Sequence, residues 1–130
     1  CILCGRCIRA CREVVNVHAI DYAGRGYVRK VASPFFKSSP DCIACGTCFY
    51  ICPTGAVTMQ EVAEGERLSI PGGEEVMGPA RVMDNWKVGL TMKRCAQCGE
   101  IIAPDFQLDY IRKRAGLKDD HFDVCPRCQK

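Results

Sequence analysis

Short apolar stretches, separated by polar and turn-forming residues, make up most of the chain. Residues 19–22 and 27–31 carry aliphatic and aromatic side chains on either side of a glycine-containing segment, a pattern that predicts a β-hairpin. Residues 54–59 predict a further strand, which would close two pseudo-symmetric βαβ halves. Residues 81–93 favour one more strand, and we interpret Trp86 within them as a core or interface anchor rather than a cofactor contact.

Near the end of the chain the apolar spacing becomes helical. Leu108 and Ile111 follow Pro104, a residue that suits the first helical position. Three basic residues then crowd the expected last turn, where they complement the helix dipole, and Gly116 predicts the stop. A short strand over residues 122–124 is expected to follow.

Glycine, proline and glutamate gather in residues 61–79, which indicates a linker or a surface β-loop. A chain of 130 residues accommodates one ordinary domain or two very small ones. We therefore expect an α+β fold with a first domain over residues 1–60, a linker or β extension over 61–92 and a small separate unit over 93–130.

Cysteine is the most informative residue type, with 12 in 130 residues. Disulfide frameworks spread their cysteines to tie distant segments together, whereas each cysteine here has another cysteine two or three residues away, so several thiolates can converge on one metal centre. No apolar stretch is long enough to span a bilayer, and no secretory segment is present. The chain opens on Cys1 without an initiator methionine, which leaves open what precedes it.

Eight of the cysteines form two runs with the spacing C-x-x-C-x-x-C-x-x-x-C, which is typical of 4Fe–4S cluster ligands. Three cysteines wrap a tight loop around one cluster, and the small Gly5 and Gly46 let the backbone pass close to it. The fourth cysteine starts a helical turn that points away and reaches the other cluster. The predicted ligand sets are Cys1, Cys4, Cys7 and Cys52 for one cluster, and Cys42, Cys45, Cys48 and Cys11 for the second.

The remaining four cysteines, Cys95, Cys98, Cys125 and Cys128, form two short motifs similar to the knuckles of zinc ribbons and rubredoxins. Two such knuckles make a closed tetrahedral site of the structural kind. Zinc is the predicted metal here, and a third 4Fe–4S cluster or a single iron are the alternatives, because thiolate ligands alone do not distinguish them.

The two runs and the hairpin segment between them resemble the two-cluster bacterial-type ferredoxin domain. The match is nearest to the ferredoxin-like module in the large subunits of NAD-linked formate dehydrogenases, respiratory complex I and iron-only hydrogenases. It rests on CILCGRCIRACREV, AIDYAGRGY and CIACGTCFYICPTGAV, and so covers about the first 60 residues. Arg12 replaces a proline that often follows the fourth cysteine, whereas Pro53 keeps it. The resemblance implies a ferredoxin-like fold that relays single electrons between a donor and a catalytic centre.

Charge is distributed unevenly along the chain, with a net +5 over residues 1–40, −5 over 41–80 and +3 over 81–130. Three arginines inside the first cysteine run, Arg6, Arg9 and Arg12, can offset the charge of a bound cluster and raise its potential, or can simply be solvated. The formal net charge of +3 counts every thiol as neutral, and thiolates bound to metal would make the chain negative. Net charge therefore does not argue for nucleic-acid binding.

These patterns favour an electron-transfer subunit of a cytoplasmic oxidoreductase complex in an organism with anaerobic metabolism. Its expected partners are larger flavin-, molybdenum/tungsten- or hydrogenase-type subunits, with no membrane span. The alternative is a redox-sensing zinc-ribbon module that binds nucleic acid or protein through Arg112, Lys113, Arg114 and Lys118. Catalysis by the chain alone finds little support, because the sequence has only His18 and His121 as histidines and contains no recognisable nucleophile or phosphate-binding motif.

Overall fold

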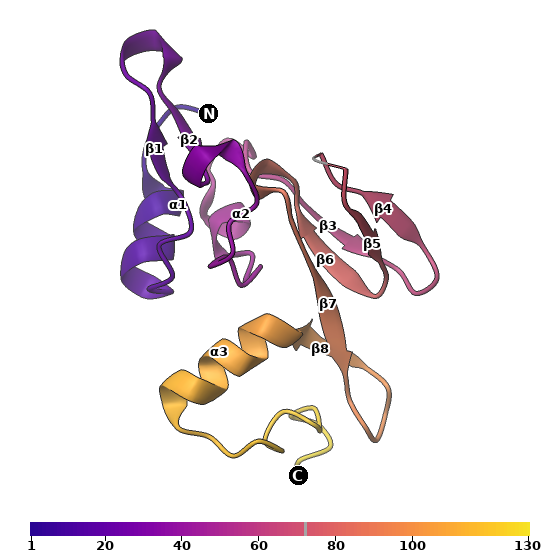
Figure 1. The fold of residues 1–130 in the computed structure, drawn as a ribbon. Helices are drawn as coiled ribbons and strands as arrows, with labels where there is room; N and C mark the ends of the chain where they lie inside the picture. Colours follow the sequence, from indigo (N-terminus) through magenta and orange to yellow (C-terminus); the bar gives the residue numbers. More distant parts are fainter. Residues whose placement is uncertain (72) are drawn as a thin grey trace.

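The computed structural model describes residues 1–71 and 73–130; Gly72, part of the expected linker, lies outside the described residues. The chain forms a small mixed α/β structure in which short helices and a hairpin come first, a β-sheet follows and one longer helix comes near the end (Figure 1). No helix in the described ranges is long and apolar enough to cross a membrane.

The first part of the chain places each cysteine run on a short helix. Helix α1 (Arg6–Arg9) continues into a π-helical turn, η1 (Ala10–Val14), and α2 (Thr47–Ile51) packs beside them. A glycine in the left-handed conformation precedes each helix, with φ 71° at Gly5 and 75° at Gly46. At Gly5 an added Cβ would lie 2.6 Å from the hydroxyl oxygen of Tyr22, so only glycine fits there without rearrangement.

The hairpin predicted between the two runs is confirmed. Strands β1 (Asp21–Ala23) and β2 (Lys30–Ala32) pair antiparallel, with Asp21 opposite Ala32. Their bounds differ from the prediction because the tip is longer than a tight turn. Tyr27 lies in a 3₁₀ turn, η2 (Gly26–Val28), and is fully exposed, so its side chain has no apolar partner to hold it in a strand. A second 3₁₀ turn, η3 (Pro34–Phe36), follows β2.

A four-stranded antiparallel sheet in the order β3-β6-β7-β8 connects the first part of the chain to the last. Its strands are β3 (Met59–Val62), β6 (Ala80–Met83), β7 (Val88–Arg94) and β8 (Ile101–Pro104). The strand expected over residues 54–59 therefore begins only at Met59. It pairs with β6, so it does not close two βαβ halves within the described residues.

The segment expected to be a linker or surface loop carries a second hairpin, formed by β4 (Arg67–Ser69) and β5 (Glu75–Met77). Its side chains Ile70 and Val76 pack with Val62 and Val82 in a small core. The hairpin approaches β7 closely at Gly89, where an added Cβ would lie 2.5 Å from a methyl carbon of Val76. Residues 81–93 form β6, the 3₁₀ turn η4 (Asp84–Trp86) and most of β7, two strands where one was expected.

The main core lies where the end of the sheet meets the cysteine runs. Met83, Trp86 and Val88 come from the sheet and its turn, and they pack with residues of the first part of the chain such as Ile8 and Val57. Trp86 is 3% exposed, which confirms its predicted place in the core.

The last part of the chain contains the predicted helix. Helix α3 (Asp105–Ala115) follows Pro104 and ends at Gly116, whose φ of 64° allows the left-handed stop. Leu108 is buried, while Ile111 is partly exposed. The strand predicted over residues 122–124 is wrong, since turns occupy this stretch. The hydroxyl group of Tyr110 donates a hydrogen bond of 2.9 Å to the carbonyl oxygen of Val15, which attaches α3 to the end of η1.

Candidate metal centres

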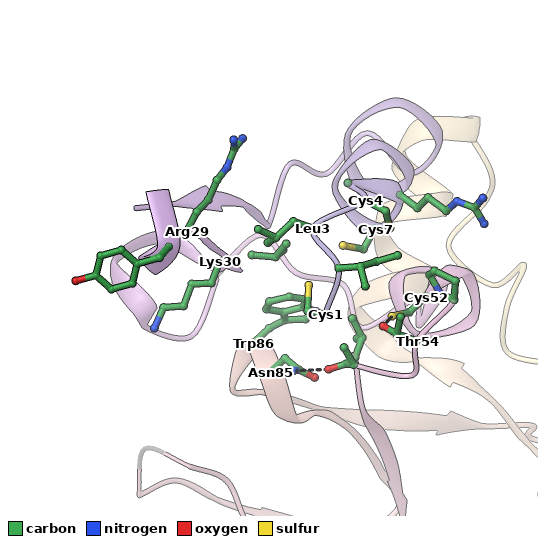
Figure 2. Close-up of a pocket in the computed structure, with 18 residues that line it drawn as sticks. Cys1, Leu3, Cys4, Cys7, Arg29, Lys30, Cys52, Thr54, Asn85 and Trp86 are labelled. Carbon is green, nitrogen blue, oxygen red and sulfur yellow. Dashed lines mark hydrogen bonds between the residues drawn. The ribbon is translucent and has the colours of Figure 1, made fainter. Parts of the chain in front are cut away.

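A cavity of about 330 Å³ lies between the first cysteine run and the end of the second. Two of its cysteines lie on the loop that leads into α1, the third lies within α1, and the fourth caps the end of α2 (Figure 2). These four are Cys1, Cys4, Cys7 and Cys52. They are the residues that the spacing predicts for one cluster, with Cys52 contributed by the other run.

Contacts within the first part of the chain shape this cavity. The hydroxyl group of Tyr22 donates a hydrogen bond of 2.9 Å to the carbonyl oxygen of Leu3, which holds the loop between Cys1 and Cys4 against the β1–β2 hairpin. On the opposite side, the hydroxyl group of Thr54 lies 3.6 Å from the Cys52 sulfur. Hydrogen bonds from Thr54 lower the pKa of Cys52 to about 7, because they stabilise its thiolate.

A second, narrower cavity lies beside the first and is lined by the other four cysteines of the two runs, Cys11, Cys42, Cys45 and Cys48. Its walls are apolar, and Val17, Ile20 and Met83 contribute to them. Burial raises the pKa of Cys42 to about 12 and that of Cys48 to about 11, because a thiolate is poorly solvated there. Such sulfurs carry negative charge only when a bound cation or a hydrogen bond offsets the cost of burial.

Hydrogen-bond donors point at the sulfurs of the second cavity. The backbone N–H of Ala19 donates to the Cys11 sulfur at 3.4 Å, and the Thr47 hydroxyl lies 3.3 Å from the Cys45 sulfur. The indole Nε1–H of Trp86 donates to the Cys48 sulfur, also at 3.4 Å. Each cavity is lined by four cysteines and has a hydrogen-bond donor directed at sulfur, and the second cavity also has apolar walls. These features fit an iron–sulfur cluster in each cavity.

The contact between Trp86 and Cys48 is a feature that sequence reasoning missed. Thirty-eight positions separate the two residues along the chain, and no local motif links them. The available signal was a single tryptophan in a predicted core strand, which indicates burial but not a sulfur partner.

The third group of cysteines is more compact. The sulfur atoms of Cys95, Cys98, Cys125 and Cys128 all lie within 4.8 Å of one another. All 12 cysteines belong to the described part of the chain, and only this set forms a group with sulfurs so close together. The sequence-predicted site residues are therefore brought together, although the two pairs are far apart in the chain.

Backbone amides shape this third group. The N–H of Cys125 donates to the Cys95 sulfur at 3.2 Å. Amide donation from Cys98 and Cys125 lowers the pKa of Cys95 to about 6. The two knuckles are also joined by a hydrogen bond from the N–H of Ala96 to the carbonyl oxygen of Asp123, at 2.9 Å. Cys95 and Cys125 are buried, whereas Cys98 is exposed.

Two of the basic residues at the end of α3 have partners within the last part of the chain. Arg112 forms ion pairs with Asp109 at 3.1 Å and with Asp119 at 2.7 Å. Arg114 donates a hydrogen bond of 2.8 Å to the hydroxyl oxygen of Tyr110. These side chains stabilise the helix end and its following loop, which reduces the cationic surface that a nucleic acid would need.

Comparison with known families gives a match over the first part of the chain. Residues 1–56 match the model of the 4Fe-4S dicluster domain. This range contains both cysteine runs and ends before the sheet begins.

Curated relatives extend the comparison. The chain is 40% identical over 135 residues to a protein of Rhizobium meliloti (strain 1021) named as part of an NADH-quinone oxidoreductase, an alignment that covers 91% of this chain and 15% of the relative. It is 36% identical over 63 residues to NADP-reducing hydrogenase subunit HndD of Solidesulfovibrio fructosivorans, covering 47% of the chain and 11% of the relative.

A third relative, from Staphylococcus haemolyticus (strain JCSC1435), carries formate dehydrogenase in its name. It is 40% identical over 62 residues, which cover 44% of the chain and 6% of the relative. The chain thus spans 15% or less of the length of these relatives, and it corresponds to a small region of each.

Proposed function

Because residues 1–56 belong to the family of 4Fe-4S dicluster domains, we propose that this chain is the electron-relay region of a larger oxidoreductase. The chain is homologous to regions of a quinone oxidoreductase subunit, a hydrogenase subunit and a formate dehydrogenase-like protein, which supports this proposal. The observation that carries the proposal is the sorting of eight cysteines into two adjacent cavities, each with three sulfurs from one run and one from the other.

In this proposal Cys1, Cys4, Cys7 and Cys52 hold one 4Fe–4S cluster, and Cys42, Cys45, Cys48 and Cys11 hold the second. When bound, such clusters accept and release one electron at a time. The chain supplies the sulfur ligands, the apolar walls that limit access of water to the second cavity, and the donors that stabilise charge on sulfur. Exchange of the fourth cysteine between runs makes the two sites neighbours.

For the third group of cysteines we favour a single metal ion, and zinc in particular. A tetrahedral zinc site with Zn–S bonds of about 2.3 Å separates its sulfurs by about 3.8 Å. The Cys98 and Cys125 sulfurs are 3.6 Å apart, and all four lie within 4.8 Å. A 4Fe–4S cluster binds each cysteine to a different iron and therefore needs its sulfurs further apart. A single iron ion bound by four thiolates would need a similar separation of the sulfurs. The geometry therefore does not distinguish iron from zinc, and metal analysis does.

The relatives support a place within a larger assembly. Their names include a quinone oxidoreductase subunit and a hydrogenase subunit, and each is much longer than this chain. We propose a cytoplasmic complex, in an organism with anaerobic metabolism, in which flavin-, molybdenum/tungsten- or hydrogenase-type domains exchange electrons with this region. The ferredoxin-like and zinc-ribbon-like descriptions of its two ends, and boundaries near residues 60 and 93, are part of the same proposal.

The test is the content of iron, acid-labile sulfide and zinc per chain after anaerobic purification. The expected result is about eight iron, about eight sulfide and about one zinc. About twelve iron and twelve sulfide with no zinc would contradict the single-ion site and leave the relay intact. Iron without sulfide would contradict the two-cluster proposal itself.

A further inference from the structure

The side chain of Trp86 forms a wall that the two cysteine-lined cavities share. It lines the cavity of Cys1, Cys4, Cys7 and Cys52, and it also lines the cavity of Cys11, Cys42, Cys45 and Cys48. Figure 2 shows the indole beside Cys1 in the first of these cavities. Trp86 lies outside the residues matched by the dicluster family, so the sheet adds this wall to the cysteine-bearing region.

The indole faces the two cavities differently. Its only polar hydrogen, on Nε1, is directed at the Cys48 sulfur of the second cavity at 3.4 Å. Among the described residues, no side-chain N–H donates to a sulfur of the first cavity, where the side-chain partner is the Thr54 hydroxyl beside Cys52. The first cavity therefore meets the carbon surface of the ring, and the second meets its hydrogen-bond donor.

Hydrogen bonds made by the neighbouring residues Asn85 and Asp84 fix the position of the turn η4, which carries Trp86. Asn85 accepts a hydrogen bond from the backbone N–H of Thr58 at 2.7 Å, and its amide donates to the carbonyl oxygen of Ala56 at 3.0 Å. Asp84 accepts a hydrogen bond from the Gln60 side chain at 3.0 Å. The turn η4 is thus attached to the chain that leaves Cys52, and the Trp86 side chain is packed in the main core with only 3% of its surface exposed.

A hydrogen bond to a cysteine sulfur stabilises the more negative, reduced form of a bound cluster and so raises its reduction potential. We propose that Trp86 is a positioning residue that separates the potentials of the two sites, because its Nε1–H raises the potential of the Cys11, Cys42, Cys45 and Cys48 site and leaves the other site unaffected. This inference rests on the proposed two-cluster function. It gives the electron a preferred site within the pair.

The experiment is an anaerobic redox titration of the loaded full chain, with dithionite as the one-electron donor and electron paramagnetic resonance as the readout. Trp86→Phe keeps an aromatic ring in the wall and removes the N–H. The midpoint potential of the cluster at Cys11, Cys42, Cys45 and Cys48 should fall by about 59 mV, the equivalent of a tenfold change in a one-electron equilibrium constant. The midpoint potential of the other cluster should stay unchanged. Tyr50→Phe is the matched control, because Tyr50 is an exposed aromatic residue of the second run, and both midpoints should stay at their wild-type values.

Two outcomes would overturn the proposal: unchanged midpoints in Trp86→Phe, or an equal shift of both, which would indicate a general change in packing or solvation. If the Trp86→Phe chain does not bind its clusters, benzothienylalanine at position 86 is the second variant, because it replaces the N–H with sulfur at nearly constant shape. The same shift of one midpoint potential without the other is expected for it. Failure of the two-cluster function would instead appear as missing iron and sulfide in the wild-type chain.

Discussion

The eight cysteines of residues 1–52 and the four of residues 95–128 have similar short spacings, but the structure arranges their sulfur atoms differently. The first eight line two cavities and pack against a core that includes Met83, Trp86 and Val88. The last four lie within 4.8 Å of one another, in a stretch with few buried residues besides Cys95, Leu108 and Cys125. Similar motifs thus lead to two arrangements, one supported by apolar packing and one that, in our proposal, a bound metal ion would stabilise.

The pKa values of the thiols vary within each group of cysteines and not simply between the groups. Burial raises the pKa of Cys42 and Cys48 to about 12 and about 11, whereas hydrogen bonds from Thr54 lower that of Cys52 to about 7. In the last group, amide hydrogen bonds lower the pKa of Cys95 to about 6, whereas the neighbouring Cys125 and Cys98 thiols raise that of Cys128 to about 12. Cysteine spacing thus selects a loop shape, while the environment of each sulfur sets how readily it becomes a thiolate.

Exchange of the fourth ligand is the strongest way to test the first half of this comparison. Cys52→Ser should remove the cluster of Cys1, Cys4 and Cys7, although Cys52 belongs to the other run, and should leave about four of about eight irons. Cys11→Ser should remove the other cluster. Iron analysis and electron paramagnetic resonance of both variants provide the measurement.

Cys98→Ser is the control for these variants, because it changes a cysteine of the third group and should leave the iron content unaltered. Loss of the same resonance signal in Cys52→Ser and Cys45→Ser would contradict the exchange of ligands between runs.

Removal of zinc tests the second half of this comparison, the proposal that a metal ion stabilises the four-cysteine region. Structural zinc contributes on the order of 10 kcal/mol or more to the folding of small zinc-binding units. A chelator should therefore unfold the last part of the chain and expose Lys113 and Lys118 to trypsin, while the visible absorption of the clusters persists. Continued protection of these sites after zinc has been removed would mean that packing of α3, and not the metal, maintains this unit.

Packing of the main core should contribute more to the stability of the eight-cysteine region than to that of the four-cysteine region. Met83 is 1% exposed and packs in the core beside the second cavity, so Met83→Ala should destabilise the fold by about 2–5 kcal/mol through the cavity it leaves. Iron should be lost more readily than zinc, as measured by metal release during anaerobic urea titration. Met77→Ala is the matched control at a residue that is 57% exposed, and its effect should stay within about 0.5 kcal/mol. Equal loss of both metals in Met83→Ala would show that the two regions do not differ in this way.

The smallest expected effect concerns the link between the regions. Tyr110→Phe removes the hydrogen bonds to the carbonyl oxygens of Val15 and Asn16, at 2.9 and 3.2 Å, and should cost about 1 kcal/mol. Hydrogen exchange should rise in α3 and in η1 together. Tyr27→Phe, at a fully exposed tyrosine, should change neither. An increase confined to α3 would indicate that this contact does not couple the two regions.

Local features of the chain were predictable to different degrees. The hairpin between the cysteine runs and the helix that ends at Gly116 follow from turn residues and apolar spacing, and the structure confirms both. The strand expected over 122–124 is wrong, because hydrogen bonds of the knuckle turns take up the backbone there. The strand expected over 54–59 begins later, at Met59, where pairing with Met83 becomes available.

Local sequence was enough to identify the candidate ligands, because cysteine spacing and the glycine before each helix act within a few residues of each other. The closeness of the four sulfurs of the third group, and the contact between Trp86 of η4 and Cys48, emerge only in the folded chain. The place of Trp86 depends on the antiparallel pairing of β6 and β7 on either side of η4, which lies far from Cys48 in the chain. The register of such pairing is set by burial of whole faces of the sheet, and no short motif encodes it.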